Sequence, residues 1–508
     1  MINKRKFVYF VLFPLLILGL VISLTPASLF PEAATAEVDA PVRTGGTAGT
    51  QGKHTQGNHT QGNSAKNKHY DVVVIGSEIQ GVLLAREAQK QGLSVLILDP
   101  RNKPGGELIQ GQMMFLDEPH DAKKRSLVQG EIKTLFDGYN SGKIRKEADF
   151  NRYYDRLIKG IPIQSGITVM SVASTPSGGK EKLLKSLTYR DHQGSIGIIE
   201  AGYWVENTDF NALTGQLNVK RIPGMERISK VGHPDYMAAT MMLKFKHVNW
   251  SKLHQAVLDD YPLTNVRDKY GGNTYVDWDF ATGFSNITLK YKPRDPQLLL
   301  RGMNTSYQRG GEAIMNSLLI FDVNPSDPKS VQTALEKAKA EAPSILQFLR
   351  QNIPGFDRAE LNGFPDYLYI RDYNRFETDY MLTFSDVMNS RMFWDNVSIG
   401  GYALDLQGTR TVPKGIHLGQ PDRYGIPLRS FELKGYGNVL VTGKNIGATI
   451  EAYGSARIMP NTALAAQTIG IILGRELKQG KRLHDLNPDD FQRIHQYLKT
   501  DYHIKVAG

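Results

Sequence analysis

The sequence predicts an α/β protein in which a domain built on a parallel sheet is interrupted by an inserted, mixed α+β domain. A strand, a turn, a helix and a second strand follow one another without a gap over residues 71–100. Another strand, a loop and an apolar helix come late in the chain, over 438–477, and can return to the same sheet. Between these two units, residues 236–395 mix strand patterns with one long helical pattern, which predicts the inserted domain.

The first unit has the order of a dinucleotide-binding fold. Val72 to Ile75 is a β-branched apolar run of strand length. The turn at 76–81 reads Gly-Ser-Glu-Ile-Gln-Gly, and the helix that follows ends at Gly92. A second strand, Ser94 to Leu98, closes on Asp99. This β-turn-α-β order predicts a nucleotide site at the turn.

Each residue type at this turn has a physical role. Gly76 permits a tight turn, and Gly81 lets the helix pack close to the sheet. The first N–H groups of the helix and its dipole attract a pyrophosphate, and the Asp99 carboxylate can accept hydrogen bonds from ribose hydroxyls. Glu78 stands at the middle glycine position, where a carboxylate repels phosphate unless it points away. The alternative is an ordinary βαβ unit that binds no nucleotide.

Composition excludes several kinds of site. The 508-residue chain contains no cysteine, which rules out thiol nucleophiles, iron–sulfur clusters, thiolate zinc sites and cysteinyl flavin links. The net charge of +10 is spread along the chain, so we expect no nucleic-acid partner. Acidic residues and one histidine gather over 117–121, but their spacing favours a polar loop, and we predict no metal site.

The N-terminus has the features of an export segment. Lys4 to Lys6 is positively charged, Phe7 to Leu24 is an apolar run of 18 residues, and Ala34 to Ala36 offers a small-x-small cleavage site. We expect an extracytoplasmic protein that is either secreted or tethered to the outer face of the cytoplasmic membrane, with membrane-surface association through this segment. Residues 37–68 contain the pentapeptide His-Thr-Gln-Gly-Asn twice, at 54–58 and 59–63. They are predicted to be a disordered tether.

Composition shifts divide the chain into six predicted segments. They are the signal peptide or anchor (1–36), the tether (37–68), the first part of the nucleotide-binding domain (69–235), the inserted domain (236–395), the second part of the nucleotide-binding domain (396–480) and a C-terminal extension (481–508). Local patterns also predict helices over 122–139 and 328–352, a strand over 286–291 and a loop over 447–460.

Three residues are candidates for chemistry beyond the turn. Arg371 and Arg375, with Asp372 between them, can clamp a carboxylate or stabilise an anionic ring; a structural Arg–Asp pair is the alternative. His417 is a candidate proton donor by residue type, and a purely structural histidine is the alternative. The sequence contains no arrangement typical of a hydrolase.

Four motifs, taken together, resemble the broad bacterial family of FAD-dependent oxidoreductases with the glutathione-reductase-type two-domain fold. The resemblance covers about residues 69 to 480 in the right order. The motifs are Gly105-Gly106-Glu107-Leu108-Ile109-Gln110-Gly111, Ile370-Arg371-Asp372-Tyr373-Asn374-Arg375, Tyr424-Gly425-Ile426-Pro427-Leu428-Arg429-Ser430, and Leu440 to Ile446 followed by Gly454 to Asn461.

The resemblance implies a Rossmann-like FAD-binding domain with an inserted substrate domain, and FAD as the cofactor. It implies that Gly76, Ser77 and Gly81 face the pyrophosphate, with Glu78 at the same turn, and that Asp99 holds the adenosine ribose. The other implied contacts lie along the cofactor or beside its isoalloxazine ring: Gly105, Gly106, Gly443, Met459, Pro460 and Asn461. The chain departs from the family pattern at Glu78, at Lys444 and at Glu206 to Asp209.

Two functions from different classes follow. The first is an exported FAD-dependent oxidoreductase that transfers a hydride between a small-molecule substrate and FAD and passes the electrons to a separate acceptor. The second is a surface-tethered binding or scaffold protein that keeps the flavoprotein fold without redox activity. Glu78 and the tether favour the second function, and a flavin spectrum distinguishes the two.

Overall fold

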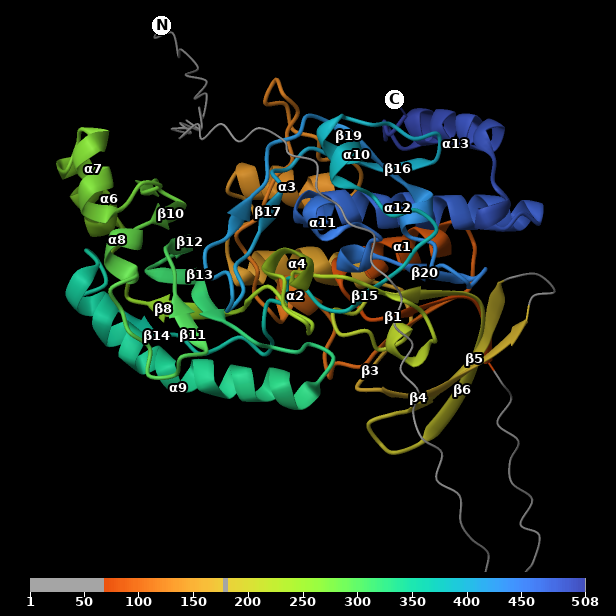
Figure 1. Ribbon diagram of the computed structural model, residues 1–508, viewed down its shortest axis with the longest axis horizontal. Helices are drawn as coiled ribbons and strands as arrows, with labels where there is room; N and C mark the ends of the chain where they lie inside the picture. Colours follow the sequence, from red (N-terminus) through yellow and green to blue (C-terminus); the bar gives the residue numbers. More distant parts are fainter. Residues whose placement is uncertain (1–67, 177–180, 508) are drawn as a thin grey trace, which may run out of the picture. The chain divides into compact units, whose positions relative to one another are not determined.

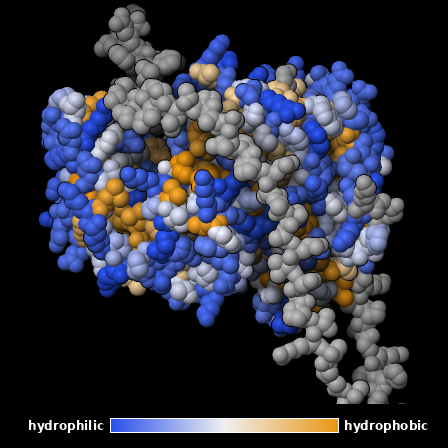
Figure 2. Space-filling view, in the orientation of Figure 1, coloured by the Kyte–Doolittle hydropathy of each residue, from blue (hydrophilic) through white to orange (hydrophobic). Residues whose placement is uncertain are grey.

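The computed structural model describes residues 68–176 and 181–507. The predicted export segment and the tether up to residue 67 therefore lie outside the described residues. Lys68, predicted as the end of the tether, already belongs to the first strand. Among the described residues, no helix is both long enough and apolar enough to cross a membrane. Figure 2 shows mostly hydrophilic residues on the visible face of the molecule, with hydrophobic residues gathered in a few patches.

The first sheet contains the predicted β-turn-α-β unit. Its strands lie in the order β3-β2-β1-β6-β5-β4, and β20 also pairs with β6. Strands β1, β2, β3, β6 and β20 are joined by parallel pairs, whereas β4 and β5 are antiparallel to their neighbours. The strands are β1 (Lys68–Ile75), β2 (Val95–Asp99), β3 (Ile163–Ser165), β4 (Thr168–Pro176), β5 (Lys182–Arg190), β6 (Ile196–Glu206) and β20 (Val439–Val441).

Both faces of this sheet are covered. In β1, Val72 and Val74 belong to one hydrophobic cluster, and Val73 and Ile75 belong to another. This follows from the alternation of side chains along a strand, and burial on both faces explains the unbroken apolar run. One cluster contains helices α1 (Ile79–Lys90), α3 (Ile132–Asn140), α4 (Glu147–Ile158) and α12 (Met459–Glu476).

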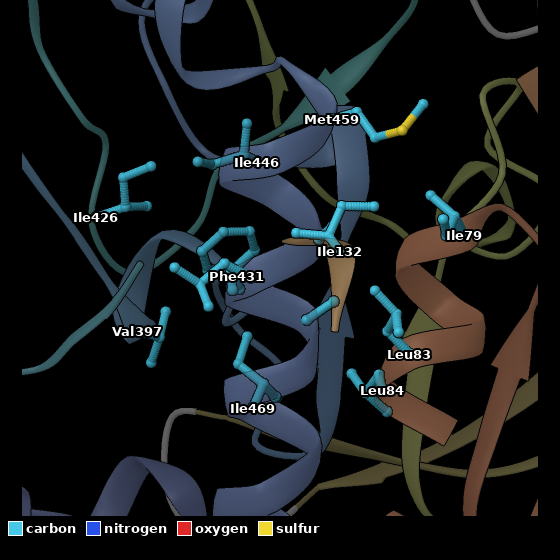
Figure 3. Packing of buried hydrophobic residues seen from close by; sticks show 14 of the residues in the cluster. Ile79, Leu83, Leu84, Ile132, Val397, Ile426, Phe431, Ile446, Met459 and Ile469 are labelled. Carbon is cyan, nitrogen blue, oxygen red and sulfur yellow. The ribbon is translucent and has the colours of Figure 1, made fainter. Parts of the chain in front are cut away.

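Helix α12 is apolar on all sides, and its position explains why. Ile79, Leu83 and Leu84 of α1 point toward it from one side, while Val397 and Ile426 lie on the other side (Figure 3). These last two residues belong to β16 (Asn396–Gly400) and β19 (Tyr424–Pro427). A helix surrounded in this way needs no polar face.

The second sheet is formed by residues within the predicted inserted segment. Its order is β14-β8-β13-β12-β10-β9, β11 also pairs with β13, and every pair is antiparallel. The strands are β8 (Ala239–Lys246), β9 (Tyr275–Val276), β10 (Phe280–Gly283), β11 (Leu298–Leu300), β12 (Met303–Arg309), β13 (Glu312–Ile320) and β14 (Glu360–Leu361). Helix α9 (Pro328–Asn352) lies along this sheet (Figure 1), with Asp327 as its N-cap.

Shorter elements connect the two sheets or follow them. The helices are α2 (Gly106–Ile109), α5 (Glu226–Ser229), α6 (Trp250–Asp259), α7 (Leu263–Tyr270), α8 (Ser285–Thr288), α10 (Phe384–Met388), α11 (Ile450–Ala456) and α13 (Pro488–Asp501), and the strands are β7 (Arg221–Ile222), β15 (Arg375–Phe376), β17 (Asp405–Leu406) and β18 (Ile416–His417).

Three local predictions were wrong. The helix expected over 122–139 begins only at Ile132, because the chain before it forms a loop with a bridge between His120 and Ser126. The strand expected over 286–291 is instead the short helix α8, which follows Phe284 in the left-handed conformation. The loop expected over 447–460 contains α11, where buried apolar residues stabilise a helix despite the glycine and serine content.

Candidate active site

The turn at Gly76 to Gly81 has the tight packing that its glycines predict. Gly76 has a φ of +97°, and a Cβ at this position would lie 2.8 Å from the Asn207 carbonyl oxygen. A Cβ at Gly81 would lie 2.3 Å from the Asn207 side-chain nitrogen and 2.8 Å from a methyl group of Val74. The turn therefore sits directly on the residue that follows β6, at the carboxyl end of the parallel strands, where such sheets bind ligands.

The N-termini of α1 and α12 lie side by side at this edge. The Gln80 Nε2 donates to Thr462 Oγ1 at 3.1 Å, which joins the first turns of the two helices. Neither helix has a side-chain cap or an acidic residue in its first turn. The uncapped N–H groups and the two positive dipole ends favour an electron-rich ligand between the helices.

The Glu78 carboxylate points away from the start of α1. It pairs with Arg101 and accepts a hydrogen bond from the Glu107 N–H at 2.8 Å. It also lies against Gly106, where a Cβ would be 1.9 Å from Glu78 Oε2. Gly105 and Gly106 both have positive φ. The paired glycines thus make room for the carboxylate of Glu78, and Arg101 neutralises its charge.

Asp99 lies at the end of β2, as predicted, and is fully buried. Its carboxylate accepts hydrogen bonds from the N–H and hydroxyl of Ser77 and from the N–H of Arg101, the last at 2.8 Å. The Tyr154 hydroxyl donates to the Ser77 carbonyl at 2.7 Å. Asp99 therefore ties the turn to the loop after β2, and contact with a ribose stays a prediction.

A second set of charges is buried nearby. The Lys444 Nζ lies 2.7 Å from Glu107 Oε2 and 2.5 Å from the Ile370 carbonyl oxygen. Burial alone would lower the pKa of Lys444, but the carboxylates of Glu107 and Asp209 raise it above its usual value. Burial also raises the pKa of Asp209 to about 7, with a contribution from Glu78. Gly443, beside Lys444, has a φ of +62° and faces Gln80 of α1.

A small cavity lies next to the start of α12. Part of its wall is polar and part is apolar. The polar residues are Glu107, Asp117, Tyr369, Lys444 and Arg457, and the apolar residues are Met113, Leu116, Phe136, Ile458 and Met459. Met459, predicted to lie beside the ring of the cofactor, lines this cavity. Asn461, also predicted beside the ring, has a buried Oδ1 without a partner in the described part of the chain.

Asp117 was not predicted to be a site residue. Burial raises its pKa, and a hydrogen bond from Tyr402 and the charge of Arg457 oppose this shift only in part. A carboxyl group with a raised pKa in a cavity wall suits proton transfer. The sequence signal for Asp117 was its place in the acidic stretch 117–121, which we interpreted as a polar loop.

The three predicted catalytic residues do not form one group. Arg371 donates to the Ala238 carbonyl at 2.9 Å and to Thr240 Oγ1 at 2.7 Å. The Arg371 guanidinium lies over the ring of Tyr369. Arg375 instead donates to the Ala448 carbonyl at 2.7 Å and lies over the ring of Tyr453. The two arginines therefore do not form the predicted two-arginine clamp.

Asp372 and His417 do not line the cavity. The Asp372 carboxylate accepts a hydrogen bond from the Met237 N–H at 3.4 Å, and burial raises its pKa to about 6. His417 is exposed on β18 and is not a lining residue of the cavity. The role of His417 as a proton donor stays a prediction.

A family model described as "FAD dependent oxidoreductase" matches residues 71–495. The chain belongs to this family. FAD is therefore its cofactor, and the chain is an FAD-dependent oxidoreductase with a Rossmann-like domain, as its motifs predicted. A comparison with curated proteins finds no match.

Solved structures match most of this chain at low sequence identity. A geranylgeranyl bacteriochlorophyll reductase-like protein from Thermoplasma acidophilum is 11% identical, with a TM-score of 0.37, over 86% of this chain and 84% of that one. Tetracycline destructase Tet(51) is 10% identical, with a TM-score of 0.39 and coverages of 86% and 88%. The p-nitrophenol 4-monooxygenase PnpA from Pseudomonas putida DLL-E4 is 11% identical, with a TM-score of 0.36 and coverages of 86% and 87%.

The described residues of this FAD-dependent oxidoreductase fit its cofactor. The first turns of α1 and α12 leave their N–H groups uncapped for the pyrophosphate, and Glu78 does not block them. The unpartnered Oδ1 of Asn461 offers a buried acceptor to a polar ring edge. The assignment of single residues to the pyrophosphate, the ribose or the ring stays a prediction.

Proposed function

We propose that this FAD-dependent oxidoreductase is exported and transfers a hydride between a small-molecule substrate and FAD in the cavity beside α12. The observation that carries the proposal is that one cavity combines an uncapped helix start with a carboxyl group of raised pKa, that of Asp117. When bound, FAD supplies the redox chemistry. Asp117 holds or accepts the proton that leaves the substrate, and Lys444 and Arg457 provide positive charge in the same wall.

The alternative scaffold function loses its main support. It rested on Glu78 as a carboxylate that repels phosphate, and this carboxylate is paired with Arg101 and turned toward the 105–107 loop. The predicted extracytoplasmic location and a separate electron acceptor remain part of the proposal, because they rest on residues 1–36 and on the need to reoxidise the flavin.

The absorption spectrum of the purified full-length protein tests the proposed activity. Two bands, near ~450 and ~370 nm, are expected for a bound flavin, and substrates are then found by loss of the longer-wavelength band without oxygen. Colour that stays with acid-precipitated protein would indicate a covalent link. A folded protein that stays colourless after addition of FAD would overturn the proposal in favour of a binding protein. Fractionation of cells, with detection of the protein outside the cytoplasm, tests the export.

A further inference from the structure

We infer that the substrate is an organic anion whose carboxylate is bound by the guanidinium groups of Arg301, Arg371 and Arg457. The inference rests on the proposed function, since it names the substrate class of the same cavity. The sequence predicted that Arg371 and Arg375 together bind the anion. We replace that pair with a cluster of three arginines that folding brings together. We call Arg301, Arg371 and Arg457 the arginine cluster.

The arginine cluster forms no ion pair among the described residues. Among the ion pairs of residues 68–176 and 181–507, none includes Arg301, Arg371 or Arg457. Arg371 is only 4% exposed and Arg457 only 6%. A buried charge without an opposite charge is costly, so the cluster is suited to receive an anion.

A shared acceptor holds two of the guanidinium groups, those of Arg301 and Arg371, near each other. Arg371 Nη2 and Arg301 Nη2 both donate to the Asn316 Oδ1, at 3.1 and 3.3 Å. Arg457 Nη2 donates to the Asp405 carbonyl at 3.2 Å. The Nε atoms of Arg301 and Arg457 are buried without an acceptor in the described chain. The cluster is therefore oriented by neutral acceptors and keeps donors to spare.

The charges around the cluster leave an excess of positive charge. Asp117 and Asp405 are the carboxylates that act on these arginines. Burial opposes the charge of Arg457, but Tyr369, Tyr453 and Asp405 raise the pKa of Arg457 above its usual value, so the excess of positive charge is felt at Arg371. Burial, followed by the repulsion from Arg301 and Arg457, lowers the pKa of Arg371 to about 9 despite the opposing effect of Tyr369. An anion beside Arg371 would relieve this repulsion.

One member of the cluster, Arg457, lines the cavity, and Arg371 lies behind the lining residue Tyr369. Arg457 and Tyr369 line the cavity directly, and the Arg371 guanidinium lies 4.3 Å from the centre of the Tyr369 ring. The Asn316 Nδ2 contacts the sulfur of Met113, another lining residue, at 3.8 Å. The rest of the wall contains Asp117, the ion pair of Lys444 with Glu107, and an apolar half formed by Met113, Leu116, Phe136, Ile458 and Met459. A ligand that satisfies the arginine and the apolar half has an apolar body and a planar anionic group, and guanidinium groups match a carboxylate well.

The experiment measures anion binding by calorimetry on the purified full-length protein, without turnover. The probes are acetate, benzoate and succinate, with acetamide and benzamide as uncharged controls and sulfate as an inorganic oxyanion. We expect at least one carboxylate to bind, and its amide to bind at least about tenfold more weakly. Arg371→Gln and Arg301→Gln should each weaken carboxylate binding about tenfold or more, and Arg371→Lys should retain part of it.

Arg350→Gln is the matched control, because Arg350 also donates to a backbone carbonyl, that of Ala359, but lies on α9 and does not line the cavity. It should bind as the unaltered protein does. Four outcomes would each overturn the inference. They are equal binding of benzoate and benzamide, sulfate binding without carboxylate binding, no binding of any carboxylate, and unchanged binding by folded Arg371→Gln and Arg301→Gln. A flavin-loaded protein that ignores carboxylates defeats the inference alone, whereas a colourless protein that binds them defeats the proposed function alone.

Discussion

Glu78 shows how one residue can depart from a motif without abolishing the site. Its carboxylate and the Arg101 guanidinium are both nearly buried and form an ion pair. Burial opposes the charge of Arg101, but Asp99 and Glu78 raise the pKa of Arg101 well above its usual value. The middle glycine of the motif is thus replaced by a charge that Arg101 and the Glu107 N–H keep in place.

Removal of Arg101 is expected to damage FAD binding. In Arg101→Met, the Glu78 carboxylate loses its partner close to the predicted pyrophosphate, so we expect FAD affinity to fall at least about tenfold and stability to fall by about 3–5 kcal/mol. Fluorescence titration with FAD and urea unfolding measure the two effects. The second change Glu78→Gln should restore part of the affinity. Lys252→Met, which removes an exposed pair with Asp357, is the control and should cost less than about 1 kcal/mol.

Asp117 is expected to act as a proton acceptor in substrate oxidation. Asp117→Asn keeps the size of the side chain but cannot take up a proton, so kcat should fall by about 10²–10⁴ while the flavin spectrum is retained. Because burial raises the pKa of Asp117 and a base must be ionised, kcat/KM should rise with pH through a value above the ordinary 3.8. Pre-steady-state measurement of flavin reduction across pH tests this, and an unchanged pH profile in the variant would exclude the role.

The raised pKa of Asp209 predicts that the free energy of unfolding depends on pH. Its pKa is about 7 in the folded protein against 3.8 ordinarily, so the folded state binds more protons than the unfolded state between these values. The stability that Asp209 contributes is thus present at low pH and is lost as pH rises toward 7. Relative to Asp209→Asn, the free energy of unfolding should fall by up to about 1.4 kcal/mol per pH unit in this window. Urea unfolding from pH 4.5 to 7.5 checks the slope, and a flat difference would refute it.

At the scale of elements, the close approach of α1 and α12 depends on small residues. A Cβ at Gly470 would lie 2.4 Å from the Leu84 carbonyl oxygen, and one at Gly474 would lie 2.1 Å from the Gln91 Cβ. The first turns of the same two helices form the predicted cofactor site, so their spacing affects both stability and binding.

Gly470→Ala should therefore push α12 away from α1. The contact is with backbone and cannot be relieved by a side-chain rotation, so we expect a loss of about 1–3 kcal/mol and weaker FAD binding. Differential scanning calorimetry and FAD titration measure both. Gly232→Ala serves as the control, because nothing lies within 4 Å of a Cβ there, and it should have little effect. Equal behaviour of the two variants would contradict the proposed packing.

Local patterns predicted some elements well and others poorly, for physical reasons. The strand before Gly76, the strand before Asp99 and helix α9 each combine a clear pattern with a start or stop signal. Helix α11 lacks such a signal, because its glycine and serine content is typical of a loop and burial decides its conformation. The family motifs linked Gly443 to the pyrophosphate and Met459 to the isoalloxazine ring, which no local pattern does, and both assignments stay predictions.

At the scale of the whole molecule, the cavity combines residues that are distant in sequence. Asp117 follows the first strands, Tyr369 follows the second sheet, and Arg457 precedes α12. Arg301 reaches Asn316 from the neighbouring segment of the chain, because β13, which carries Asn316, pairs with β11 and β12. Arg371 reaches the same Asn316 from a segment 55 residues later, which the sequence pattern does not show. Arg375 looked equivalent to Arg371 in sequence, but four residues along an extended chain it reaches a different neighbour.

The order of synthesis has a consequence for how this enzyme acquires its cofactor. The turn at Gly76 is made early, but its partner, the start of α12, is made only after the entire inserted sheet and β20 have been translated. A ribosome-bound nascent chain that ends before Met459 lacks half of the predicted cofactor site, so we expect it not to retain FAD. We therefore expect FAD to be loaded only after α12 has been synthesised, and a route that exports an unfolded chain would require the cofactor to be supplied on the far side of the membrane.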